Sequence, residues 1–571
     1  SLSLSLSLSL CVCVCVCVGT EMERYRVRVN SHVVECGVVQ LHCPAPMNTQ
    51  TLLRLASTWP VELQFSEWME TATEVLQLKP AQAEGLFEVY LHLEHVDVEE
   101  FTLRTREELG AVDGNELEDY IKYRFVQRAP FLLFLFLQLT ERTAPQSPRN
   151  HPDAAWPEHD AAAAGTSPSL AGGAGAAGNS PRLSVSKIGN IQSKLALQES
   201  VQHHVEKHLR DAISLAAGGK DMVDQDAVRA LEFLLSVEPI RGEPIPLENV
   251  FGRAFPASVP FVESTLSSVI RGSSWPPVQL QVVGGKLSVN ESLKSGSLDH
   301  PGLFHLEGIS KVTIFKSVDD VKNLDVRIVC SQQCNIFLLA PLRSVTIYGC
   351  RKCNVTLGPV TRGLFIEHCE KVQVSVCCRG LYASDNTDTV INTCTNLRPV
   401  LSSSNRGLIL GPLNSFYGTL EDHLVSSGVN PLLNKWNHPI LLGGTSLTNC
   451  WSEQDPKDYF MHVCPYEIAG STKICPSPVP NAYADALEDR ARQLEAMKKK
   501  IRSTHEEWGC GEEIQNHIKE QFKEWLVSSG HTRLIYDLIK SGGGGGGGGS
   551  SSAGSGSSSS SAHGVSTPFN R

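Results

Sequence analysis

The sequence has no excess of basic residues. Among its 571 residues, 50 lysines and arginines stand against 61 aspartates and glutamates, which gives a formal net charge of −11. Proteins whose main task is to bind nucleic acid normally carry a basic face and a high isoelectric point. The composition therefore argues against nucleic acid as a partner, and the chain carries no RNA- or DNA-binding motif.

Long hydrophobic runs and a secretory signal are also missing. The apolar run Phe131–Leu137 is too short for a membrane span, which needs ~20 residues, and it is predicted to be a buried helix. The start alternates Ser-Leu and then Cys-Val without the features of a signal peptide. Such a repeat is typical of translated simple-sequence DNA, with Met22 as the expected first residue. Reduced cysteines and a cytoplasmic location are therefore expected.

Catalytic motifs are absent as well. The chain lacks a GxSxG elbow, a glycine-rich phosphate loop ending in Lys-Ser or Lys-Thr, and the kinase signatures. His204 and His208 could share one helix face, but Glu206 stands one place away from the position that the zinc motif His-Glu-x-x-His requires. A solvated helix face is favoured over a metal site there. We expect a protein that is not an enzyme and uses no cofactor or metal.

Composition and periodicity divide the chain into seven segments. Four of them carry predicted structure and three are low in complexity. The segments are a Ser-Leu and Cys-Val repeat (1–21), a helical N-terminal region (22–142), a disordered linker rich in Ala, Gly, Pro and Ser (143–185), a second helical region (186–300), a β-helix domain (301–440), a short β segment with helices (441–540) and a flexible Gly/Ser-rich tail (541–571).

The helical segments show apolar residues at helical spacing. Leu197, Val201, Val205 and Leu209 follow one another at four-residue steps. In the last predicted helix, 512–540, an apolar stripe contains Ile514, Ile518, Phe522 and either Trp525 or Leu526. This stripe needs a cover, for which packing on the β-helix or its cap is favoured over a partner protein.

The segment from about Gly302 repeats itself every 19 residues. Short runs rich in Val, Ile, Leu, Thr and Cys alternate with polar corners, as in strands. The repeated units are Val345–Ile347 with Cys350, Leu364–Ile366 with Cys369, Cys334–Ile336, and Cys353–Val355. A period of this size is too short for two helices and predicts the stacked coils of a β-solenoid.

The same period bears on the cysteines. The spacings Cys330-x3-Cys334 and Cys350-x2-Cys353 are compatible with a zinc ribbon. The repeat instead stacks Cys350 on Cys369 and Cys334 on Cys353, at coil spacings of ~4.8 Å. Buried ladders of free cysteine are therefore favoured over a metal site.

Four arginines follow a similar step. Arg343, Arg362, Arg379 and Arg398 stand 19, 17 and 19 residues apart, each just before a predicted strand. Stacked like charges repel by ~0.2–1 kcal/mol, so these side chains are expected to fan into solvent or to hold acidic groups. The favoured interpretation is a polar corner. The alternative is a surface for an acidic partner.

Several segments together resemble a known family. The segments Leu339–Cys350, Leu357–Pro359, Leu420–His423 and Trp436–Pro439 are similar to the TBCC domain-containing protein 1 family, which is related to tubulin-folding cofactor C and to the retinitis pigmentosa 2 protein. The resemblance implies a right-handed parallel β-helix (a cofactor C-like or C-CAP domain) over about 302–440 with mostly helical flanks. It extends to Phe131–Leu135, Asp226–Leu231 and Cys464–Glu467.

The resemblance also bears on catalysis. Cofactor C and the retinitis pigmentosa 2 protein are GTPase-activating proteins with an arginine finger in a Cys-Gln-Gln-Leu-Arg type motif. Such a finger stabilises charge on the transferring phosphoryl group and is worth ~10³–10⁵ in rate. In Cys378-Arg379-Gly380-Leu381-Tyr382, Tyr382 takes the finger position. Tyrosine is neutral at pH 7 and cannot supply the cation.

The resemblance finally implies a function and a location. It implies a non-catalytic scaffold or adaptor of the centrosome, basal body and spindle pole, involved in centrosome or centriole positioning, Golgi organisation and cell shape. The implied partners are proteins at that site, with tubulin or a small GTPase as candidates. The alternative is a GTPase-activating or tubulin-folding cofactor that uses Arg379 or Arg362 as its finger. A third interpretation is a protein that binds a GTPase without accelerating it.

Overall fold

The structure is a computed structural model that describes part of the chain. The described parts are residues 25–39, 44–93, 125–140, 197–239, 245–273 without 253–254, 280–283, 286–289, 297–300, 302–442, 450–528 without 467 and 509–510, and residues 532 and 535. The predicted repeat at 1–21, linker at 143–185 and tail at 541–571 lie outside the described residues.

The N-terminal region is mostly helical, with short strands between the helices. Its helices are α2 (Ser31–Cys36), α3 (Thr49–Thr58), α4 (Phe65–Glu74), α5 (Pro80–Leu93), α8 (Arg128–Leu137), α10 (Leu209–Ala216), α11 (Gln225–Leu231) and α12 (Val259–Val269), with a 3-10 turn at Leu247–Phe251. Strand β1 (Tyr25–Val29) lies between β5 (Leu235–Pro239) and β7 (Ile270–Ser273). The remaining strands form two-stranded sheets: β2 (Glu62–Gln64) with β3 (Phe125–Gln127), β4 (Met222–Val223) with β6 (Ala257–Ser258), and β8 (Leu280–Val283) with β9 (Lys286–Val289).

The apolar patterns of the sequence account for the packing of these helices. Every residue of the run Phe131–Leu137 in α8 is buried, which confirms the predicted buried helix. Val201, Val205 and Leu209 of the four-residue pattern are also buried. The helix breaks at His208, and α10 then begins at Leu209.

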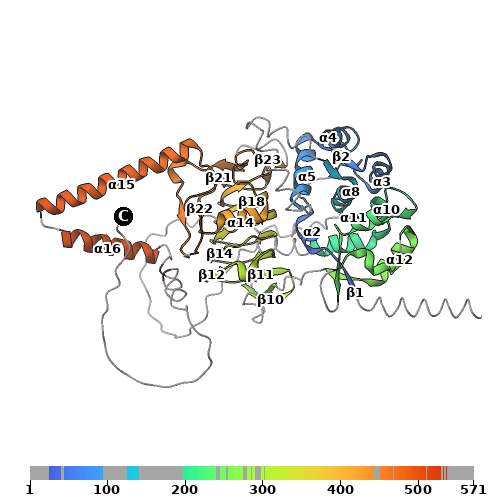
Figure 1. The fold of residues 1–571 in the computed structure, drawn as a ribbon, viewed down its shortest axis with the longest axis horizontal. Coiled ribbons are helices and arrows are strands. Elements are labelled where there is room, and N and C mark those ends of the chain that lie inside the picture. The colour runs from blue at the N-terminus through green and yellow to red at the C-terminus, as the bar shows by residue number, and fades with distance from the viewer. Residues whose placement is uncertain are drawn as a thin grey trace, which may run out of the picture. The chain divides into compact units, whose positions relative to one another are not determined.

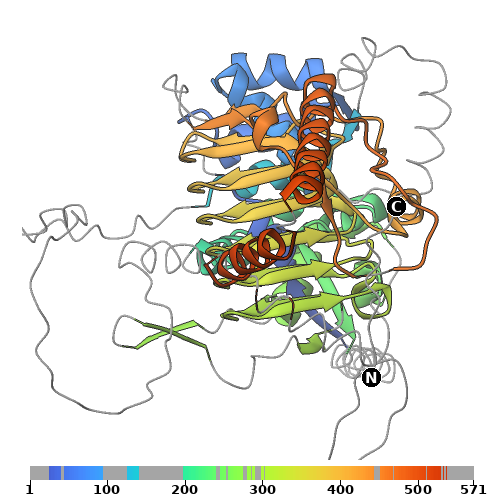
Figure 2. The ribbon, with the colours of Figure 1, turned by 90° about the vertical axis from the view of Figure 1, so that its left-hand side faces the viewer.

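The second half of the chain is a parallel β-helix of about six turns over residues 303–412, which confirms the predicted fold class. Figure 2 shows its coils stacked above one another. One stack contains β11 (Leu303–Glu307), β13 (Asp325–Val329), β15 (Ser344–Tyr348), β17 (Val360–Glu367), the end of β18 (Gln373–Ser384), β20 (Val400–Ser402) and β23 (Ile440–Leu442). The other contains β12 (Thr313–Lys316), β14 (Asn335–Leu338), β16 (Asn354–Leu357), the start of β18, β19 (Val390–Thr395), β21 (Leu408–Pro412) and β24 (Trp451–Glu453).

The strands pair in the register that the 19-residue period predicts. Val345 pairs with Leu364 and Val355 with Val374, 19 residues apart in each case. The side chains that point inward form one apolar core, which contains Val345, Leu364 and Leu381. Antiparallel strand β10 (Ser297–His300) pairs with β11 at the first coil.

Two further regions lie against the β-helix. Helix α5 contacts β17, β18, β20 and β23, so the N-terminal helices lie beside one stack of strands (Figure 1). The segment before Trp436 lies against β19, where Asn396 donates hydrogen bonds to the carbonyls of Asn430 and Leu433 at 2.7 Å. That segment includes α14 (Leu420–Ser427).

The C-terminal part of the described chain is helical. Helix α15 (Asn481–Trp508) packs its first turn on the β-helix, where the hydroxyl of Tyr483 donates to the carbonyl of Gln454 at 2.7 Å. Helix α16 (Gly511–Ser528) belongs to a second unit, 510–571. Its Ile518, Phe522 and Trp525 are 50%, 53% and 52% exposed, and the packing of this stripe on the β-helix or its cap stays a prediction. None of the described helices is long and apolar enough to cross a membrane.

Candidate functional site

The predicted arginine ladder is real for three of its four members. Backbone pairing aligns Arg343 with Arg362, whose N–H donates to the Arg343 carbonyl at 2.8 Å. Gly363 pairs with Gly380, which aligns Arg362 with Arg379. Tyr382 pairs with Val400, so Leu397 takes the position next to Arg379 and Arg398 lies one residue further on. Arg379 and Arg398 stand 19 residues apart, as Arg343 and Arg362 do, so this one-residue shift could not be recognised from the sequence.

Two of the arginines hold acidic groups of the same chain. The guanidinium of Arg343 donates to both carboxylate oxygens of Asp325, at 2.9 and 2.6 Å. Burial alone would raise the pKa of Asp325, but Arg343 and the Ser344 hydroxyl outweigh it and hold that pKa below its ordinary value. Arg398 forms an ion pair with Glu84 of α5.

Of the other two arginines, Arg379 is buried and Arg362 is half-buried. Arg379 is 3% exposed. Burial lowers the pKa of Arg362 to about 10. The prediction that the ladder fans into solvent is therefore wrong for Arg379, because helix α5 packs on the coil that carries it.

His92 of α5 makes the closest contact with this part of the β-helix. Its ring lies on Gly380, where an added Cβ would come within 2.0 Å of the ring carbon Cδ2. Burial and, to a lesser extent, the charge of Arg379 together lower the pKa of His92 to about 3. The imidazole is therefore neutral at pH 7, and a neutral ring lies where a cation would repel Arg379.

Tyr382 lies under the same helices. It is 4% exposed and belongs to a hydrophobic core that it shares with Phe365, Val400 and Leu442 of the β-helix and with the N-terminal helices. Its ring lies 6.1 Å from that of Phe365. The side chain at the finger position is therefore part of an internal interface.

Helix α2 makes a polar contact with the same stack of strands. The carboxylate of Glu35 accepts a hydrogen bond from Arg327 at 2.7 Å, and both side chains are nearly fully buried. The thiol of Cys36 lies 3.4 Å from the Thr346 hydroxyl. This contact connects the first helix among the described residues to strands about 300 residues later.

His32 of α2 completes this contact. Its ring nitrogen Nδ1 lies 3.3 Å from the hydroxyl of Ser344, which in turn donates to Asp325 at 2.6 Å. Burial lowers the pKa of His32 to about 4, against the opposing effect of Asp325. Sequence analysis did not identify His32, Glu35 or His92, because nothing in the local pattern shows which distant strand each one meets.

The cysteines form ladders as predicted. Cys353 follows Cys334 by one coil, and Cys369 follows Cys350, with all four side chains buried. Burial raises the pKa of Cys350 well above its ordinary value, which keeps it a neutral thiol. Within the described parts of the chain, no cluster of three or more His, Cys, Asp or Glu residues could hold a metal ion.

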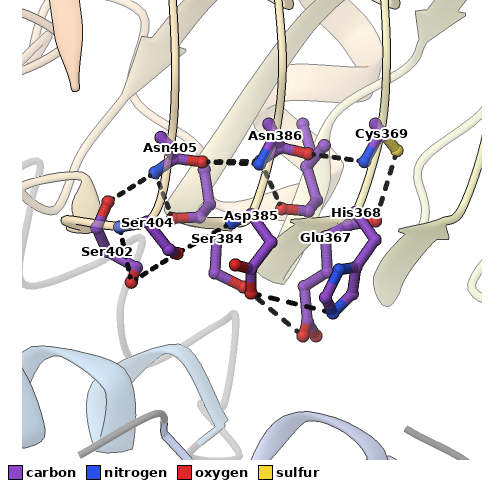
Figure 3. A network of polar contacts seen from close by, with 11 residues as sticks. Glu367, His368, Cys369, Ser384, Asp385, Asn386, Ser402, Ser404 and Asn405 are labelled. Atoms are coloured by element: carbon purple, nitrogen blue, oxygen red, sulfur yellow. Dashed lines mark hydrogen bonds and ion pairs between the residues drawn. The ribbon is translucent and has the colours of Figure 1, made fainter. Parts of the chain in front are cut away.

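Asparagines continue the second cysteine ladder in the next two coils (Figure 3). The side-chain oxygen of Asn386 accepts from the backbone N–H of Cys369, and that of Asn405 accepts from the N–H of Asn386, each at 3.0 Å. In the same view, His368 lies 3.7 Å from Asp385, and Ser384 donates to Glu367 at 3.5 Å. The ladder satisfies backbone groups at this corner, and its role is structural.

Comparison with known proteins agrees with the fold. The model of the family "Tubulin binding cofactor C" (TBCC) matches residues 318–440. The human protein named TBCC domain-containing protein 1 is 25% identical over 536 residues, which cover 87% of this chain and 93% of its own length. The zebrafish and rat proteins of that name are 30% and 31% identical over 49% and 40% of this chain, respectively, and over 48% and 40% of their own length.

These comparisons agree with the resemblance seen in the sequence. The matched residues 318–440 lie within the coils and the segment that returns to them at β23. The similarity to the human protein covers 87% of this chain and so extends beyond these coils. Residues 318–440 therefore match the tubulin binding cofactor C family, and the similarity of the chain to TBCC domain-containing protein 1 extends well beyond these residues.

Proposed function

We propose that the chain is a non-catalytic scaffold or adaptor of the centrosome or basal body, which contributes to centrosome or centriole positioning, Golgi organisation and cell shape. The observation that carries the non-catalytic part is the burial of Tyr382 in the core between the β-helix and the N-terminal helices. An arginine finger must reach the phosphates in the nucleotide site of another protein. The residue at the equivalent position here has neither the charge nor the exposure for that task.

The neighbouring arginines do not replace the finger. Arg379 is buried beneath α5, beside the neutral ring of His92. Arg343 and Arg398 each hold a carboxylate of the same chain. To reach a GTPase, the strands that carry these arginines would have to lose α5 and its apolar contacts. That loss would remove a large part of the core that the β-helix shares with the N-terminal helices.

The cytoskeletal part of the proposal rests on the family. The TBCC family is named after a cofactor that binds tubulin, and the proposed partners are proteins of the microtubule-organising centre, with tubulin or a small GTPase as candidates. The second candidate function is a GTPase-activating or tubulin-folding cofactor. The arginines at stacked positions are the observation that keeps it open.

One kinetic experiment separates the two functions. Single-turnover GTP hydrolysis by tubulin and by Arf-like GTPases is measured with and without the full chain. We expect no acceleration. Acceleration that disappears in Arg379→Ala or Arg362→Ala would establish the cofactor function instead. A pull-down with GTPase locked in its GTP form tests separately whether binding persists without catalysis.

Localisation tests the scaffold. The fluorescently tagged full chain is expected at the centrosome or basal body of a ciliated cell line, and its depletion is expected to displace the centrosome from the cell centre. A diffuse cytoplasmic signal together with a normal centrosome position after depletion would contradict the proposal.

A further inference from the structure

One exposed corner of the β-helix carries a residue with left-handed backbone in every coil. These residues are Lys311, Gln333, Lys352, Lys371, Asp388 and Gly407, with φ values of 55, 52, 51, 54, 48 and 61°. Backbone hydrogen bonds connect the coils here. The N–H of Lys352 donates to the carbonyl of Glu370 at 2.9 Å, and that of Lys371 to Thr387 at 3.0 Å.

Lysine is a costly choice for this backbone. A left-handed conformation brings Cβ close to the neighbouring carbonyl, so it favours glycine and, to a lesser extent, asparagine or aspartate. Only Gly407 follows that preference fully. Lys352 and Lys371 also lie in adjacent coils at ~4.8 Å, where like charges repel. Folding alone would therefore favour other residues at these positions.

Within the described residues, these lysines have no acidic partner. Lys311, Lys352 and Lys371, the lysine ridge, are all exposed, and none of them forms an ion pair with any residue that the structure describes. The arginines on the side of α2 and α5 differ, because Arg327, Arg343 and Arg398 all bind a carboxylate of the chain. A charge that is costly and that no described residue neutralises can be used by a binding partner.

The surroundings of the ridge are polar and positive. Two positions after the corner residues Gln333, Lys352 and Lys371, the strands present Asn335, Asn354 and Gln373. The Asn354 amide donates to Asn335 at 3.0 Å. The corner itself carries five basic residues and two acidic ones. The basic residues are Lys311, Arg351, Lys352, Lys371 and Arg406, and the acidic ones are Glu370 and Asp388. Glu370 is engaged by Arg351 at 3.2 Å.

We propose that the lysine ridge and its row of carboxamides bind an acidic segment of a partner protein. The ammonium groups pair with its carboxylates, and the carboxamides hydrogen-bond to its backbone. A net charge of −11 makes a polyanionic nucleic acid or a negatively charged membrane a poor match for the chain as a whole. A short acidic segment meets only the local positive surface. This inference rests on the proposed scaffold function and specifies the chemistry of its partner.

The binding test uses the full chain and a fluorescently labelled peptide of alternating glutamate and glycine, followed by anisotropy. We expect the charge-reversed variant Lys352→Glu/Lys371→Glu to bind at least about tenfold more weakly, a difference of ~1.4 kcal/mol. The matched control Lys220→Glu/Lys457→Glu makes the same change of charge at two exposed sites elsewhere. It should bind like the natural chain, and rising salt should weaken binding of both.

A second double variant separates the effect of the lysine charges on binding from their effect on folding. Lys352→Gly/Lys371→Gly removes both charges and relieves the left-handed backbone, so its thermal midpoint should be unchanged or higher. Peptide binding should fall nonetheless. If the glycine variant binds like the natural chain, or if the control variant loses as much affinity as the ridge variant, the proposal is wrong.

Two other ligands provide the remaining outcomes. Phosphatidylserine vesicles and a single-stranded RNA oligonucleotide are titrated in parallel. Binding of either one that depends on the ridge, without ridge-dependent peptide binding, overturns the assignment to an acidic protein segment. These results concern the ridge alone, whereas localisation and GTP hydrolysis of the natural chain test the proposed function, so the two can fail separately.

Discussion

At the scale of single residues, His92 and Gly380 make the most demanding contact between the two halves of the chain. The ring of His92 occupies the space where any larger residue at 380 would place its Cβ. The sequence contains the signal for this contact, because Arg-Gly-Leu occurs in two successive coils, at Arg362–Leu364 and Arg379–Leu381. It does not say what the glycine makes room for.

Gly380→Ala tests this contact. The added methyl group would meet the imidazole at 2.0 Å, so we expect the free energy of unfolding in urea to fall by about 1–3 kcal/mol. The double variant Gly380→Ala/His92→Ala should recover part of this loss, because the smaller side chain at 92 makes room for the methyl group. Additive losses in the double-mutant cycle would contradict the contact.

The buried histidines predict a dependence of stability on pH. The folded-state pKa values of His32 and His92 are lowered to about 4 and about 3 from 6.5. At a pH between the folded-state pKa and 6.5, the unfolded chain binds more protons than the folded chain. The free energy of unfolding therefore decreases as the pH falls below about 6.5. Each histidine contributes up to ~1.4 kcal/mol per pH unit. Urea titrations at pH 7 and pH 5 should show the loss, and His92→Gln should reduce it.

Some contacts of single residues could be predicted from the sequence and others could not. The stacking of Cys334 on Cys353 was predictable, because it depends only on a period within one segment. The burial of Arg379 was not, since the helix that covers it lies almost 300 residues earlier. An arginine that the sequence places at a corner therefore looks exposed until its distant neighbour is known.

At the scale of elements, helix α2 is attached to strand β13 by a buried ion pair. Glu35→Ala would leave the guanidinium of Arg327 buried without a counter-charge. We expect a loss of about 3–5 kcal/mol in unfolding free energy. Replacing both residues, Glu35→Leu with Arg327→Met, should recover most of it, since an apolar pair avoids the cost of desolvation.

A surface pair provides the control for that measurement. Arg492 and Asp489 of α15 form an exposed ion pair, for which Arg492→Ala should cost no more than about 1 kcal/mol. If the two alanine variants lost equal stability, the pair between α2 and β13 would not be buried as the structure has it.

Elements with a strong period were predictable and short ones were not. The apolar run of α8 and the coils of the β-helix each repeat a pattern over many residues. Strands such as β2 and β3 have three residues each, too few to show a period. For α16 the pattern predicts an apolar face, but a stripe indicates only that a helix can be covered and does not say by what.

At the scale of the whole molecule, the N-terminal helices and the β-helix share one core around Tyr382. Tyr382→Arg restores an arginine at the finger position but buries its charge in that core. We expect a loss of about 3–5 kcal/mol in stability and no acceleration of GTP hydrolysis by tubulin or Arf-like GTPases. Tyr382→Phe is the matched control and should remain close to the natural chain. A stable, activating Tyr382→Arg variant would show that this face opens.

The register of the coils limits how the length of this protein can change. Within the stacks, each side chain keeps its inward or outward direction only if the chain returns after a full circuit, as from Val345 to Leu364. Adding one residue within a strand would turn its core side chains outward, whereas adding a whole circuit would lengthen the stack and preserve every contact above and below. The return from Val400 to Ile440, which carries α14, has no such restriction. Insertions and deletions among related chains should therefore avoid the strands of the stack. They should occur as whole circuits, along this return, or at the corners between strands, where one circuit of 22 residues (Leu303 to Asp325) and one of 17 (Leu364 to Leu381) already differ in length.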